Sequence, residues 1–125
     1  MTKTPEQAWS AFDAAASEAA SARIVDQFAA DPERLSRMTT EAAGLHLDLS
    51  KQSWTKAAFE ACLDLARAVD VEGRRAALFA GEAVNLTEGR AVLHPALRAG
   101  AGADFHALGE PVSAEVDRVR ADIRA

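Results

Sequence analysis

Three side chains between positions 78 and 98 have types suited to catalysis: Glu88, Arg90 and His94. A carboxylate and an imidazole can act as general acid and base, and a guanidinium can hold a phosphate group. Glu88 and His94 are six residues apart, so they do not share one face of a regular helix. The stretch lacks a second base, a nucleophile and a phosphate-binding loop. We therefore expect buried or half-buried polar links that fix a junction, and we predict no catalytic residue.

The other candidate ligands and nucleophiles are isolated. His46 and Asp48 alternate with leucines on one face of an expected strand, but zinc sites need three or four ligands. Cys62 lies on the apolar side of an expected helix, where cysteine behaves as a small hydrophobe. His106, beside Asp104 in a glycine-rich stretch, is expected to be exposed. The glycines form no nucleotide-binding pattern. We predict no metal site and no cofactor site.

Composition and charge narrow the function classes. The chain has 125 residues, which is typical of one domain, and 49% of them are apolar. It has 19 acidic against 14 basic residues and no basic stripe, so a nucleic-acid partner is not expected. The single cysteine fits a reducing compartment. No secretory leader and no long apolar run are present, so no membrane partner is expected.

Local signals predict the elements of the first half. Thr4, Pro5 and Gln7 are typical of a helix start. The apolar stripe that follows reaches Phe28 and could break at 17–21, and the helical region ends at 31–32. Alternation over 44–50 predicts a strand, paired with 34–40 across 41–44. Trp9 and Trp54 are expected to anchor the core.

The second half is predicted to be helical between loops. Ser53 is expected to open a helix that reaches Val69, and Asp70 to cap a short helix ending before Gly81. We expect a helical turn near 88–92, a helix from Pro95 that stops before Gly100, and a last helix. Ser113 is expected to cap that last helix.

The run from 81 to 98 reads GEAVNLTEGRAVLHPALR. It resembles the Gly-Glu-x-x-Asn-x-Thr-Glu-x-Arg-Ala-Val-Leu-His-x-Ala-Leu-Arg block of the glucose-6-phosphate isomerase (phosphoglucose isomerase) family, although Pro95 stands where that family usually has valine or threonine. Weaker similarities lie in the same order along the chain, at Trp9, 31–34, 41–51, 63–66 and 109–116.

The resemblance implies an N-terminal scaffold segment over 1–125, mainly α with one short β-hairpin, from an α/β enzyme of the sugar-isomerase (SIS) fold. The family interconverts glucose 6-phosphate and fructose 6-phosphate in glycolysis and gluconeogenesis, without a cofactor, as a cytoplasmic homodimer. Its catalytic glutamate, histidine and lysine and its phosphate-binding residues fall beyond Ala125. The partner of this segment is then the remainder of the isomerase chain, and the catalytic sugar-phosphate domains are absent.

Two alternatives remain open from the sequence. One is a self-standing helical module that binds another protein, and the other is a small enzyme that uses Glu88, Arg90 and His94. If the chain is a scaffold segment, it exposes apolar surface shaped for a partner. The face with Leu45, Leu47 and Leu49 is one such surface, since a two-stranded hairpin is marginal alone.

Overall fold

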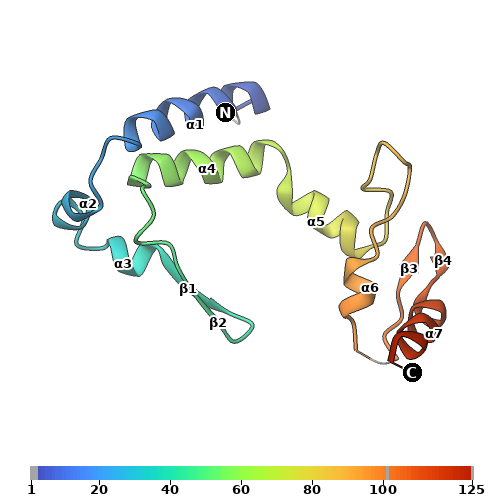
Figure 1. Ribbon diagram of the computed structural model, residues 1–125. Helices are drawn as coiled ribbons and strands as arrows, with labels where there is room; N and C mark the ends of the chain where they lie inside the picture. Colours follow the sequence, from blue (N-terminus) through green and yellow to red (C-terminus); the bar gives the residue numbers. More distant parts are fainter. Residues whose placement is uncertain (1–2, 101, 125) are drawn as a thin grey trace. The chain divides into compact units, whose positions relative to one another are not determined.

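A computed structural model describes residues 3–100 and 102–124 (Figure 1). The chain is mainly helical, with short β-hairpins, and divides into two compact units, Met1–Val69 and Asp70–Ala125. The predicted class, mainly α, is confirmed. Within the described part of the chain, no helix combines the length and apolar character needed to cross a membrane.

The first unit is built on two long helices, α1 (Pro5–Ala19) and α4 (Lys56–Ala68), which lie side by side in Figure 1. A capping box starts α1 as predicted: the Thr4 side chain accepts from Gln7 N–H, and the Gln7 side chain accepts from Thr4 N–H. Thr55, and not Ser53, caps α4. Lys3 Nζ lies 2.8 Å from Asp64 Oδ2 and ties the start of the chain to α4.

Small side chains fill the core between these two helices. Ala8, Ala19 and Ala58 are buried, so the helix backbones can approach closely. Trp9 is 62% exposed, and its predicted role as a core anchor is wrong because the alanines take the contact face. Trp54 is half-buried, with its ring centroid 5.9 Å from that of Phe59.

A hairpin projects from the first unit between short helices α2 (Ile24–Ala30) and α3 (Arg34–Arg37) and helix α4 (Figure 1). Strands β1 (Thr39–Ala42) and β2 (Leu45–Asp48) pair antiparallel, with Thr39 opposite Asp48. The predicted partner over 34–40 is wrong for its first four residues, which form α3. The turn is Ala43-Gly44, both at positive φ, as a two-residue hairpin turn requires. Leu45 is 73% exposed, as expected for an uncovered face.

The second unit contains α5 (Val71–Phe79), α6 (His94–Arg98), β3 (His106–Ala107), β4 (Glu110–Pro111) and α7 (Ser113–Arg124). Asp70 caps α5 through Gly73 N–H, as predicted. The predicted helical turn at 88–92 is wrong, because Asn85 and Arg90 form an isolated β-bridge around a turn. The β3–β4 hairpin was not predicted.

Ser113 has a different role from the predicted cap. It is the first residue of α7, and its Oγ accepts a hydrogen bond from Phe105 N–H at 2.7 Å. A backbone bond runs in the opposite direction, from Val112 N–H to Phe105 O at 3.0 Å. The side chain therefore ties the base of the β3–β4 hairpin to the start of α7.

Candidate functional site

Gly81 begins the block that the sequence singled out, and it ends α5 as predicted. Its N–H donates to Leu78 O at 3.3 Å and Glu82 N–H donates to Ala77 O at 3.0 Å, which is the Schellman pattern. The φ of Gly81 is +71°, and a Cβ on it would lie 1.8 Å from the carbonyl oxygen of His106. Only glycine satisfies both the conformation and the close approach.

Asn85 and Thr87 shape the turn that follows. The backbones of Asn85 and Arg90 exchange two hydrogen bonds, of 3.1 and 3.2 Å. Asn85 Oδ1 accepts from Thr87 Oγ1 at 2.8 Å and from Glu88 N–H at 3.4 Å, so its side chain bonds locally within the turn. Gly89 completes the turn at φ +62°. The hydrogen bonds of these polar side chains therefore hold a loop.

The three candidate side chains for catalysis are not assembled into one site. Glu88 Oε2 lies 3.7 Å from Arg90 Nη1, and both side chains are exposed, by 59% and 76%. His94 begins α6 and is exposed, and no hydrogen bond or ion pair joins it to Glu88 or Arg90 within the described residues. The prediction of buried or half-buried polar links is wrong, because the turn leaves the charged groups of Glu88 and Arg90 in solvent.

His46 and Asp48 are likewise held by separate neighbours. His46 Nδ1 lies 3.3 Å from Glu41 Oε1, across the hairpin. Asp48 accepts from Lys51 Nζ at 2.6 Å and from Ser50 N–H at 2.8 Å. These hydrogen bonds, that of Lys51 first, hold the pKa of the Asp48 carboxyl well below its ordinary value. Among the residues that the structure describes, no group of three His, Cys, Asp or Glu side chains could hold a metal ion.

Sequence reasoning missed the most highly organised polar group, Arg34. Its side chain is 1% exposed and its guanidinium donates to three backbone carbonyls. Nε reaches Ser50 O, Nη1 reaches Trp54 O and Nη2 reaches Gln52 O, each at 2.7 Å. The guanidinium carbon also lies 5.5 Å from the ring centroid of Phe28. We refer to Arg34 and the three carbonyls as the Arg34 clamp, since it fixes the loop between β2 and α4.

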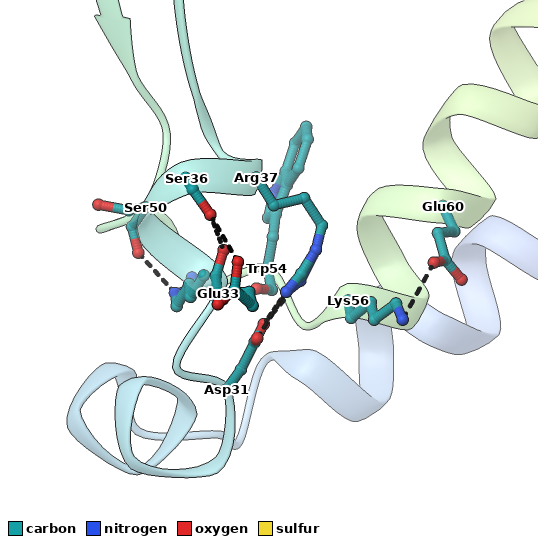
Figure 2. A network of polar contacts seen from close by, with 9 residues as sticks. Asp31, Glu33, Ser36, Arg37, Ser50, Trp54, Lys56 and Glu60 are labelled. Atoms are coloured by element: carbon teal, nitrogen blue, oxygen red, sulfur yellow. Dashed lines mark hydrogen bonds and ion pairs between the residues drawn. The ribbon is translucent and has the colours of Figure 1, made fainter.

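Polar contacts around the clamp fix α3 as well (Figure 2). Arg37 and Asp31 face each other, with Arg37 Nη1 donating to Asp31 Oδ2 at 2.7 Å. Ser36 Oγ donates to the carbonyl of Glu33 at 3.0 Å. Asp31 and Arg37 are each about a quarter exposed, so this pair is partly screened by water. A hollow of about 530 Å³ lies beside Asp31, Arg34 and Arg37. The polar contacts around the clamp join protein groups to one another, as in a structural support.

A groove lies beside the Gly81 block on the second unit and has a volume of about 460 Å³. Leu78 and Phe79 of α5 form one wall, and Pro95 of α6 forms another. Phe105, just before β3, completes the apolar lining. The polar side chains at its edge are His94 and Arg98. We call this feature the apolar groove.

Comparison with known protein families shows to which family this chain belongs. The family profile described as phosphoglucose isomerase matches residues 48–125. This chain belongs to the phosphoglucose isomerase family. The matched range contains the whole second unit, the end of β2, the clamped loop and α4. The resemblance expected from the block at 81–98 is thereby confirmed.

Relatives in the phosphoglucose isomerase family match nearly the whole chain. The glucose-6-phosphate isomerase of Caulobacter vibrioides (strain NA1000 / CB15N) is 60% identical over 120 residues, which are 96% of this chain and 22% of that protein. That of Caulobacter sp. (strain K31) is 55% identical over 94% of this chain and 22% of its own length. The glucose-6-phosphate isomerase of Deinococcus deserti is 45% identical over 95% of this chain and 22% of its own length. The chain thus spans about a fifth of the length of the curated relatives it matches.

Proposed function

We propose that this chain is the N-terminal scaffold of a glucose-6-phosphate isomerase, an enzyme that interconverts glucose 6-phosphate and fructose 6-phosphate. The observation that carries the proposal is the 60% identity to a protein of that name along 96% of this chain. The chain matches only the N-terminal 22% of that relative. The sugar-phosphate domains, of the SIS fold, then belong to the rest of the polypeptide. The whole protein works as a cytoplasmic homodimer in glycolysis and gluconeogenesis.

The chemistry of the reaction supports a scaffold role for this segment. Isomerisation of an aldose to a ketose moves a proton between C1 and C2 and needs a positioned base together with a phosphate site. Glu88 and Arg90 form an exposed pair on a turn, and His94 stands apart from them. The Arg34 clamp uses its donors on backbone carbonyls. These contacts favour a segment that supports an active site built elsewhere.

A coupled assay of fructose 6-phosphate conversion tests the proposal. We expect the full-length protein to be active and the 125-residue chain to be inactive at high protein concentration. Glu88→Gln in the full-length protein should leave kcat and KM unchanged, because the side chain faces solvent on a turn. Activity of the 125-residue chain that survives repurification and is lost in Glu88→Gln would instead assign the catalysis to this segment.

A further inference from the structure

The apolar groove of the second unit is lined mostly by apolar side chains, and one of them, Phe79, is exposed. We propose that it docks one large apolar side chain, flanked by a carboxylate, from the part of the isomerase polypeptide that this chain does not contain. The inference rests on the proposed function, since it takes the rest of the isomerase as the partner. It goes further by naming the surface, the residues and the chemistry of the contact.

The walls of the apolar groove are held in place independently of any occupant. Gly81 O accepts from Leu108 N–H at 2.8 Å, which joins the end of α5 to the β3–β4 hairpin. Arg120 Nη1 donates to Ala99 O at 3.1 Å, which joins the end of α6 to α7. Ser113 Oγ holds Phe105 at 2.7 Å, as described above. A preformed site of this kind loses little conformational entropy when it is filled.

The lining and rim define what fits. Phe79 is 62% exposed, which is unusual for a ring in a concave apolar site and typical of a surface that a partner covers. Arg98 lies at the rim, and within the described residues it makes no ion pair or hydrogen bond. Arg90 and Arg118, in contrast, each face a carboxylate. A carboxylate beside the docked apolar side chain would form the corresponding ion pair with Arg98.

Size favours a covalently linked occupant over a second copy of the chain. A groove of about 460 Å³ seats one or two large side chains. A stable dimer interface buries about 800 Å² on each partner, which is far more than such a groove provides. A segment of the same polypeptide docks at high effective concentration, so a small contact is sufficient. The relatives, of which this chain spans 22%, supply such a segment.

Hydroxyl-radical footprinting with mass spectrometry tests whether the groove is occupied, without any substitution in the protein. In the 125-residue chain, Phe79 and Leu86 should both be oxidised, since they are 62% and 76% exposed. In the full-length isomerase, oxidation of Phe79 should fall to background while that of Leu86, on the turn outside the groove, persists. Equal oxidation of Phe79 in both proteins overturns the inference. Protection of Phe79 in the 125-residue chain that rises with concentration overturns it in favour of a second copy.

Matched variants test the chemistry of the contact in the full-length protein. We expect Phe79→Ser to lower the thermal midpoint by several degrees and Leu86→Ser to leave it unchanged. Arg98→Glu should lower it as well, and Arg90→Glu should not. Equal shifts within each pair overturn the assignment of the groove. Isomerase activity of the full-length protein is measured on the same samples. If the protein is active but Phe79 is not protected from oxidation, only the docking inference is overturned. If Phe79 is protected but the protein is inactive, only the proposed function is overturned.

Discussion

The Arg34 clamp and the block from Gly81 to Arg98 use polar residues in opposite ways. Arg34 is 1% exposed and directs its donors into the protein. In the block, Glu88 and Arg90 face solvent and pair with each other. The dense run of distinctive residues in the block therefore does not mark a buried polar site, whereas the single arginine that begins α3 does. The clamp therefore completes the hydrogen bonds of a loop inside the first unit, whereas the Glu88–Arg90 pair lies on the surface of the second.

The clamp is stable because its geometry suits a guanidinium. A buried charge is costly unless it is hydrogen-bonded, and the planar fork of arginine matches three carbonyls at once. The ring of Phe28 adds a favourable face for the cation. In the block, only Gly81 is used in a comparably demanding way, through its conformation and its contact with His106. The variants below compare these two sites with their surroundings, from the largest expected effect to the smallest.

The largest effect is expected for Gly81→Ala. The added Cβ would lie 1.8 Å from a backbone oxygen that cannot move aside cheaply, at a positive φ. We expect the free energy of unfolding of the second unit to fall by about 3–5 kcal/mol, as for a strained backbone site with a steric clash. Gly89→Ala is the control, because it has the same sign of φ but nothing within 4 Å; about 1 kcal/mol is expected there. Urea unfolding followed by circular dichroism measures both, and equal losses would contradict the close approach.

Arg34→Ala should have the next largest effect. It removes three charge-assisted hydrogen bonds and leaves their carbonyls without a donor, so we expect a loss of about 2–4 kcal/mol in the first unit. Arg34→Lys should recover little, because an ammonium group cannot reproduce the fork. Arg37→Ala is the matched control, with about 1 kcal/mol expected for a partly exposed ion pair. If Arg37→Ala were as costly as Arg34→Ala in urea unfolding, the clamp would have no special role.

A smaller, pH-dependent effect is expected for Asp48. Hydrogen bonds from Lys51 and Ser50 lower its pKa from the ordinary value of 3.8. The folded state therefore binds this proton less readily than the unfolded state, and the stabilisation is present above that ordinary value. It is lost progressively as the pH falls below about 4. In Asp48→Asn the thermal midpoint should depend less steeply on pH below about pH 4. An unchanged pH dependence would show that Asp48 does not contribute.

The smallest effect is expected for the exposed pair of the block. Arg90→Ala removes a 3.7 Å contact between side chains that are mostly in water. We expect the free energy of unfolding of the 125-residue chain to change by less than about 0.5 kcal/mol. A loss of 2 kcal/mol or so, comparable to that of a buried hydrogen bond, would reverse the comparison between the two regions. Differential scanning calorimetry at two salt concentrations measures the change and its screening.

Features that depend on a few neighbouring residues could be predicted from the sequence. The capping box at Thr4, the cap at Asp70 and the C-terminal glycine at Gly81 were found because each depends on the backbone within four residues. Pro95 correctly placed α6 within one residue. The family was recognised from the spacing of side chains in the block, and the comparisons confirm it.

Features that depend on distant backbone could not be predicted. The partners of Arg34 are carbonyl groups 16 to 20 residues away, which leave no mark on residue type. Strands β3 and β4 have two residues each, too few to show alternation. Trp9 follows the helical spacing of a core residue, but alanines on the same helix occupy the contact with α4. The apolar groove requires residues from α5, α6 and the segment before β3, so no single window of sequence reveals it.

The clamp also constrains when the first unit can form during synthesis. Its last acceptor is the carbonyl of Trp54, and the contact between Lys3 and Asp64 closes the unit soon afterwards in chain order. Every partner of Arg34 is therefore made before the second unit begins at Asp70. Because domains made first generally fold first on the ribosome, the first unit can reach its native contacts while the rest of the polypeptide is still being translated.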